Sequence, residues 1–185
     1  MRVMTLSAAM IMAVALSGCA QGPKQAQSPV SVNVSSLPAV ASAAAEVDTP
    51  LGRAVLSAVN AWRGEKGEGA LTADATLQRA AAVHAADLAL RNYFGHHNPE
   101  GQGPRERVLA VDKTFSASVS ENLLVVEGPS FAAMSDAALA KLMVEKWAQS
   151  PQHRRNMQAG AMTRSGVGIG RSGERIVAVQ VFAGS

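Results

Sequence analysis

The C-terminal end of the chain constrains the fold most. It has the pattern of two paired strands, and this pattern follows several segments with helical spacing. Ser165 to Gly170 and Arg175 to Phe182 are apolar runs joined around Ser172-Gly173, which predicts a β-hairpin. Upstream, apolar residues from Leu51 to Trp62 recur at helical spacing. Helices followed by a short group of strands favour an α+β fold, with helices packed on a small antiparallel sheet.

The middle of the chain adds further elements to this pattern. Spacing of apolar residues predicts helices over Thr72–Asn92 and Ala137–Trp147, and a short helix over Pro104–Ala110. Gly95–Gly103 has the composition of a loop, whereas Asn122–Val126 has strand character. Because 48% of the residues are apolar, this part of the chain can build one ordinary core.

The N-terminal residues indicate export. Arg2 precedes an uncharged, mostly apolar run from Val3 to Leu16, which is short for a bilayer span but suits the central region of a signal peptide. One alternative is an ordinary secretory signal that is cleaved after a small residue. However, Leu16-Ser17-Gly18-Cys19 resembles the lipobox of bacterial lipoproteins, and Cys19 is the single cysteine of the chain. We therefore predict a lipoprotein signal peptide over residues 1–18 and lipidation of Cys19.

The predicted anchor and the following composition suggest a domain on a tether. Ala20, and not an aspartate, follows Cys19, so in a two-membrane bacterium we expect an outer-membrane lipoprotein that faces the periplasm. Residues 19–48 contain no aromatic residue and little charge, which predicts a flexible tether. Thr49-Pro50 has the pattern of a helix start, which places one domain at residues 49–185. The net charge of +3 does not indicate a nucleic-acid binder.

Four histidines are the main candidates for chemistry: His84, His96, His97 and His153. His84 lies on the apolar stripe of its predicted helix, which is typical of a packed core histidine. His96 and His97 follow that helix in a loop, and His153 lies in the turn after another helix. Since the chain has no HExxH motif, no cysteine pair and no phosphate-binding glycine loop, the usual metal and nucleotide signatures are absent.

Several short motifs follow one another in a distinctive order. They are Phe94-Gly95-His96, Pro99-Glu100-Gly101, Ser120-Glu121-Asn122-Leu123, Trp147, Ser150-Pro151-Gln152-His153-Arg154, Asn156, Gly166-Val167-Gly168-Ile169-Gly170 and Gln180-Val181-Phe182. In this order they resemble the bacterial branch of the CAP superfamily, which joins cysteine-rich secretory proteins, antigen 5 and plant pathogenesis-related 1 proteins. The resemblance covers nearly all of residues 51–185. It implies an α-β-α sandwich, with a three-stranded antiparallel sheet between helical layers.

The resemblance also implies a central cleft lined by two histidines and an acid, which by position are His96, His153 and Glu121. Two neutral imidazoles can hold Zn²⁺, so His96 and His153 are the expected metal ligands, with Glu121 as a base beside a bound water. Alternatively, Glu121 is a buried acid that accepts hydrogen bonds from backbone N–H groups and so stabilises the loops around the cleft. Ser120 stands where the family usually has glycine, and the second acid of many eukaryotic members has no counterpart between Trp147 and His153.

Three functions remain open at this point. The hypothesis that we favour is a lipid-anchored envelope module whose cleft binds a lipid, a sterol-like molecule, a glycan or a protein partner, with or without a divalent metal. The second is a zinc-assisted hydrolase of peptides or peptidoglycan, with His96 and His153 as ligands and Glu121 as base. The third is a structural or interaction protein whose cleft is a relic. Zinc is the one cofactor implied, and no nucleic-acid partner is expected.

Overall fold

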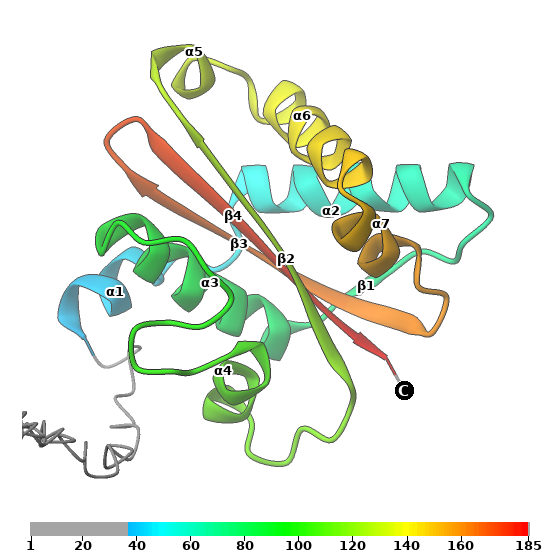
Figure 1. Cartoon of the computed structure of the whole chain (residues 1–185), viewed down its shortest axis with the longest axis horizontal. Coiled ribbons are helices and arrows are strands. Elements are labelled where there is room, and N and C mark those ends of the chain that lie inside the picture. The colour runs from blue at the N-terminus through cyan, green and yellow to red at the C-terminus, as the bar shows by residue number, and fades with distance from the viewer. Residues whose placement is uncertain (1–36, 185) are drawn as a thin grey trace, which may run out of the picture.

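Two layers of helices enclose a four-stranded sheet in the computed structural model, which describes residues 37–184 (Figure 1). The strands are β1 (Thr72–Ala73), β2 (Val119–Glu127), β3 (Met162–Ser172) and β4 (Arg175–Gly184). The helices are α1 (Pro38–Ala43), α2 (Pro50–Glu65), α3 (Ala75–Leu90), α4 (Pro104–Val111), α5 (Pro129–Ala132), α6 (Asp136–Gln149) and α7 (Pro151–Gln158). The predicted signal peptide, Cys19 and the first part of the predicted tether lie outside the described residues.

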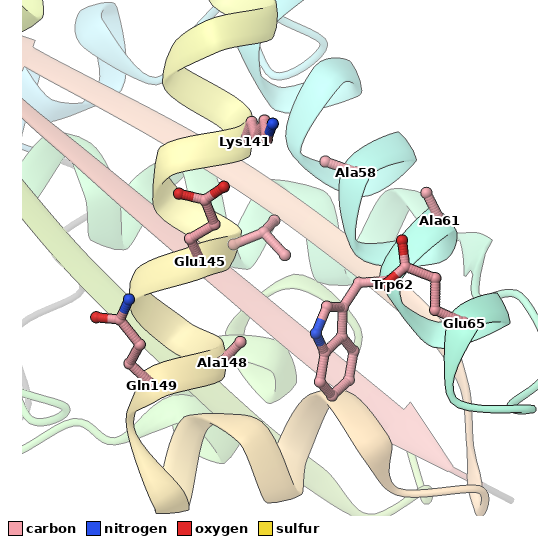
Figure 2. Close-up of a pocket in the computed structure, with 9 residues that line it drawn as sticks. Ala58, Ala61, Trp62, Glu65, Lys141, Glu145, Ala148 and Gln149 are labelled. Carbon is pink, nitrogen blue, oxygen red and sulfur yellow. The ribbon is translucent and has the colours of Figure 1, made fainter.

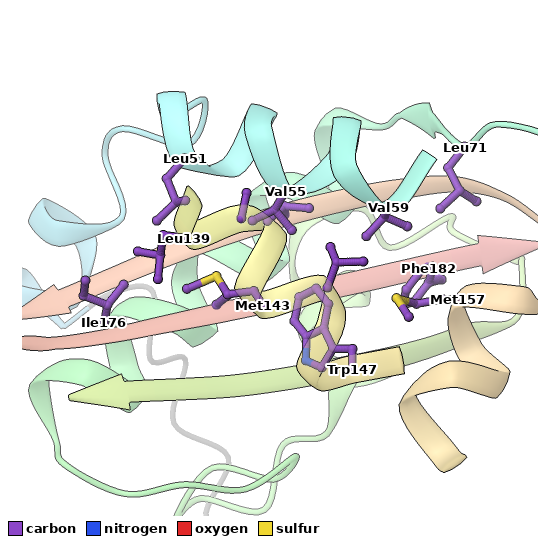
Figure 3. Close-up of a cluster of buried hydrophobic side chains, with 14 residues drawn as sticks. Leu51, Val55, Val59, Leu71, Leu139, Met143, Trp147, Met157, Ile176 and Phe182 are labelled. Carbon is purple, nitrogen blue, oxygen red and sulfur yellow. The ribbon is translucent and has the colours of Figure 1, made fainter. Parts of the chain in front are cut away.

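The central strand β4 supplies both halves of the core, since its side chains alternate between the two faces of the sheet. Ile176, Ala178 and Phe182 pack against α2, α6 and α7 in one cluster (Figure 3). The residues between them, including Val177 and Val179, pack against α3 and α4 in a second cluster. A strand that is buried on both faces is apolar along nearly its whole length. This arrangement confirms the predicted α+β class.

The sheet has the order β1-β3-β4-β2. β3 and β4 form the predicted antiparallel hairpin, and β2 pairs antiparallel with the other edge of β4. The expected three-stranded antiparallel sheet therefore needs one correction, because β1 adds a two-residue parallel strand beside β3. The sequence assigned these residues to the next helix, but Asp74 accepts a hydrogen bond from the Leu77 N–H at 3.0 Å and starts α3 after them.

The last part of the predicted tether is ordered, which differs from the expectation of a flexible segment over residues 19–48. Val40 and Ala44 of this segment are buried against Ala82, Val83 and Ala86 of α3. One side of α3 packs against the sheet. Because α3 is apolar nearly all round, its opposite side must also be covered by another element that shields it from water. The short helix α1 provides that cover. Within residues 37–184, no helix has the length and apolar character to cross a membrane.

Candidate functional site

Glu121 lies on the edge strand β2 and faces the helical layer formed by α3 and α4. Its side chain is only 1% exposed, so its charge requires partners inside the protein. Arg107 of α4 donates from Nη2 to Glu121 Oε2 at 2.7 Å. The other carboxylate oxygen lies 2.9 Å from His96 Nδ1. Both oxygens of Glu121 are therefore engaged by side chains, and not by backbone N–H groups.

The loop that carries His96 is held from within the core. His84 of α3 places Nε2 at 3.0 Å from the Gly95 carbonyl oxygen, so Nε2 carries the proton and donates. Arg107 Nη1 donates to the carbonyl oxygens of His96 at 2.9 Å and Gln102 at 2.8 Å. These bonds fix the backbone on both sides of the His96 side chain. We call His84, His96, Arg107 and Glu121 the polar cluster.

The protonation states of the cluster follow from these contacts. Burial acts to raise the pKa of Glu121, but the hydrogen bond from His96 and the charge of Arg107 outweigh it and hold that pKa below its ordinary value. Burial first, and then the positive charge of Arg107, lower the pKa of His84 to about 4. At neutral pH, Glu121 is thus a carboxylate and His84 is a neutral imidazole. Because the carboxylate accepts from His96 Nδ1–H, the remaining ring nitrogen of His96, Nε2, is available to a ligand.

His153 lies on α7, which packs against β2 from the other side of the sheet. Asn122 of β2 donates from Nδ2 to the His153 carbonyl oxygen at 3.0 Å. Asn156 of α7 donates from Nδ2 to the Glu121 carbonyl oxygen at 3.1 Å and to Asn122 Oδ1 at 2.9 Å. Burial, and then the charge of protonated His96, lower the pKa of the half-buried His153. The two helical layers therefore bring His96 and His153 to the same strand.

The three residues expected in the site do not all touch. His96 and Glu121 form a direct hydrogen bond. In the described part of the chain, the bonds that join His153 to them pass through its backbone and the Asn122–Asn156 pair. His97 is exposed, and none of the hydrogen bonds that hold the Glu121 carboxylate involves it.

Neither Arg107 nor the role of His84 was predicted from the sequence. Arg107 lies in a short helix whose apolar pattern carries no sign of a buried ion pair. His84 is fully buried as predicted, but it also holds the His96 loop and lies 4.0 Å from Glu121 Oε1. Asn156 was part of the motif series, although nothing in the sequence indicated its partners.

The donors that the structure brings together do not complete an ordinary zinc site. A carboxylate on Nδ1 of a histidine is the arrangement that commonly orients a metal-bound imidazole, and His96 has it. However, catalytic zinc sites generally use about three protein ligands. Over residues 37–184, no group of three or more His, Cys, Asp or Glu side chains is placed to hold a metal ion. The predicted metal pair His96 and His153 is thus not confirmed, and we derive no chemistry through zinc.

A separate hollow of about 590 Å³ lies between α2 and α6 (Figure 2). Trp62, Ala58 and Ala148 contribute apolar surface to it. Glu65, Lys141 and Glu145 also line it, and none of its lining residues belongs to the polar cluster.

Comparisons with known proteins identify related sequences and folds. The model of the CAP, or cysteine-rich secretory protein, family matches residues 56–182. A comparison with curated proteins finds no match. Similar solved structures include an outer surface protein from Borrelia burgdorferi, at 19% identity and a TM-score of 0.62, covering 74% of this chain and 95% of that chain.

Two other solved structures have the same fold. An extracellular protein containing an SCP domain from Bacillus anthracis is 22% identical with a TM-score of 0.57, covering 73% of this chain and 40% of that chain. A structure of NaASP2 with Zn²⁺ is 13% identical with a TM-score of 0.51, covering 72% of this chain and 80% of that chain.

Proposed function

Because the chain belongs to the cysteine-rich secretory protein (CAP) family, we propose that it is an exported, lipid-anchored envelope protein that binds a ligand beside His96, Glu121 and His153. The ligand classes are those expected from the sequence: a lipid, a glycan or a protein partner. Family membership by itself does not specify a reaction or a ligand, and only the residues of the site can indicate them.

The observation that carries the proposal is the hydrogen bond between His96 Nδ1 and the buried carboxylate of Glu121. A buried ion pair such as Glu121–Arg107 often contributes no more stability than well-packed apolar residues of the same size. The burial of the Glu121 carboxylate is therefore explained better by a role in orienting His96 than by a gain in stability. The His96 side chain is 45% exposed, so the oriented imidazole is accessible to a ligand.

Export is supported by two independent features. The lipobox-like segment that ends at Cys19 predicts an anchor in the bacterial envelope. The similar solved structures from Borrelia burgdorferi and Bacillus anthracis are described as an outer surface protein and an extracellular protein.

Ligand binding has more support than zinc-assisted hydrolysis. In the hydrolase hypothesis Glu121 is the base, but both of its oxygens are occupied and its pKa is lowered. A general base has to reach the proton that it removes, and Glu121 is buried behind His96. The two histidines also fall short of the usual zinc ligand set.

The proposal is tested by binding measurements on the full-length protein with two soluble probes, monomeric short-chain phosphatidylglycerol and peptidoglycan fragments, because the proposed lipid anchor would itself insert into vesicles. We expect saturable binding of one probe, and His96→Ala and His153→Ala to weaken it by at least about tenfold, as expected for a lost hydrogen bond to a charged group. His97→Ala is the matched control, because His97 is exposed in the same loop and stands outside the polar cluster.

Binding that is equal in all four proteins would contradict a ligand site at this position. Failure of both probes would contradict the lipid and glycan forms of the proposal. Zinc-dependent release of peptides from peptidoglycan that disappears in both histidine variants would replace binding with the hydrolase hypothesis. A calorimetric titration with zinc, on the same proteins, separates these outcomes.

A further inference from the structure

The helix that carries His153 has little to hold it in place by itself. α7 contains 8 residues, which is too short for a stable isolated helix. Its N-cap residue Ser150 makes no side-chain capping bond, and its C-cap residue Ala159 has an extended backbone instead of a left-handed cap. The orientation of α7, and with it that of His153, therefore depends on contacts with other elements.

Arg63 of α2 supplies the contact at the C-terminal end of α7. Its Nη1 donates to the carbonyl oxygens of Met157 at 2.6 Å and Ala159 at 3.3 Å. Its Nε donates to the Gly69 carbonyl at 2.7 Å, and its Nη2 to the Met162 carbonyl at 3.3 Å. The last carbonyls of a helix carry partial negative charge, so a guanidinium placed there both caps the helix and opposes its dipole.

Arg63 is buried, which makes its contacts with these carbonyl groups costly to break. The residue is only 1% exposed, and these four acceptors are all backbone carbonyls. Burial lowers the pKa of the guanidinium, and the charge of Glu68 offsets part of this effect. A buried cation is tolerated only when its donors are satisfied, so a shift of these carbonyls away from Arg63 is costly.

α7 is also attached to strand β2, which carries Glu121. Asn122 holds the His153 carbonyl, and Asn156 holds the Glu121 carbonyl. Met157 lies between these contacts and Arg63 and is fully buried in the core. Arg63 thus holds the C-terminal end of α7, while the Asn122–Asn156 pair holds its preceding part, including the His153 carbonyl, against strand β2.

We propose that Arg63 is a positioning residue for the binding site: by capping α7 it sets the place of His153 relative to His96 and Glu121. This inference rests on the proposed function for its biological meaning. Because Arg63 is buried, it acts on the site through α7 and not by direct contact with a ligand. Lysine cannot replace it, because one ammonium group cannot reach carbonyls that the planar guanidinium spans with three nitrogens.

The test uses the full-length protein and its Arg63→Lys and Arg63→Met variants. The first readout is the rate at which diethyl pyrocarbonate modifies His153 relative to exposed His97, measured by peptide mass spectrometry. The second is amide hydrogen exchange in α7 relative to α3. We expect both variants to raise the His153 to His97 ratio at least about twofold and to speed exchange in α7 about tenfold, while exchange in α3 stays unchanged.

Arg79→Met is the matched control. Arg79 also donates to a backbone carbonyl, that of Ala44 at 2.6 Å, but it holds α1 and not α7. We expect this variant to leave the His153 to His97 ratio unchanged, even where its melting temperature falls. If Arg63→Met does not fold, Arg63→Lys decides the result.

A lowered melting temperature with an unchanged His153 to His97 ratio would show that Arg63 only stabilises the fold, and would overturn the inference. The same ratio shift in Arg79→Met would overturn it too. Neither readout requires a ligand. Failure of the proposed function would instead appear as probe binding that His153→Ala leaves unchanged, so the two failures are distinguishable.

Discussion

At the scale of single residues, His84 makes the stability of the polar cluster depend on pH. It is fully buried, it donates to the Gly95 carbonyl, and burial together with the charge of Arg107 lowers its pKa to about 4. Glu121 and His96 also face it, and they change its pKa in opposite directions. An unfolded histidine titrates near about 6.5, so the unfolded chain binds a proton before the folded protein does. Stability is therefore complete above that pH and falls as the pH drops toward 4.

We expect the free energy of unfolding to fall by about 3 kcal/mol between pH 7 and pH 4 through His84 alone. Glu121, whose pKa is also lowered, adds a loss only below its unfolded value of about 4.3. His84→Gln keeps an N–H donor at this position but removes the titration, so it should flatten the decline above pH 4.5. Urea denaturation at several pH values measures this, with His97→Gln as the control. A flat wild-type profile, or an unchanged slope in His84→Gln, would contradict the assignment.

At the scale of elements, α3 lies directly on β3 without a layer of side chains between them. Gly166, Gly168 and Gly170 face the helix, and a Cβ atom on Gly168 would lie 2.2 Å from the backbone of Ala81. Alternate glycines on the strand and small residues on the helix allow this close approach. It brings His84 near enough to β2 to lie beside Glu121.

Gly168→Ala should therefore destabilise the protein by about 3 kcal/mol or more, because neither backbone can yield to the added methyl group. Thermal unfolding followed by circular dichroism measures the change. Gly64→Ala is the matched control, since Gly64 is an exposed residue of α2 with no atom within 4 Å of an added Cβ. That substitution should be neutral or stabilise by up to about 1 kcal/mol. Equal melting of the two variants would show that α3 does not pack this closely.

At the scale of the whole molecule, the folded unit begins before the first long helix. Val40 is 2% exposed and packs with Ala44 against α3, and Arg79 donates to the Ala44 carbonyl at 2.6 Å. α1 thus covers the outer side of α3, the helix that contributes His84 to the polar cluster.

Val40→Asp should release α1 and lower the free energy of unfolding by roughly 2 kcal/mol, the value of burying one valine side chain. Ser42→Asp adds the same charge to an exposed position of α1 and should change little. Urea denaturation measures stability, and limited proteolysis between residues 37 and 48 measures the release of α1. If both variants resist proteolysis like the wild type, α1 is not held by Val40.

The elements that were predicted correctly are those with strong local patterns. Thr49 accepts a hydrogen bond from the Gly52 N–H at 3.0 Å and starts α2, as its sequence indicated. The hairpin turns at Gly173, which has a φ of 56° that suits glycine. By contrast, α1, β1 and α7 were missed because each is short. Such segments become ordered by packing on neighbours, which no local pattern reveals.

The candidate site was likewise predicted only in part from the sequence. The motif order was enough to single out His96, Glu121 and His153, and the lone cysteine at Cys19 still predicts lipidation. The ion pair of Glu121 with Arg107 was not foreseeable, because Arg107 comes from a different element, α4, and its motif carries no sign of this contact. Local order depends on residues that are neighbours in the chain, and a sequence records these directly. The chemical state of Glu121 instead depends on burial and on groups that α3, α4 and the His96 loop bring close to it, and these surroundings exist only in the folded molecule.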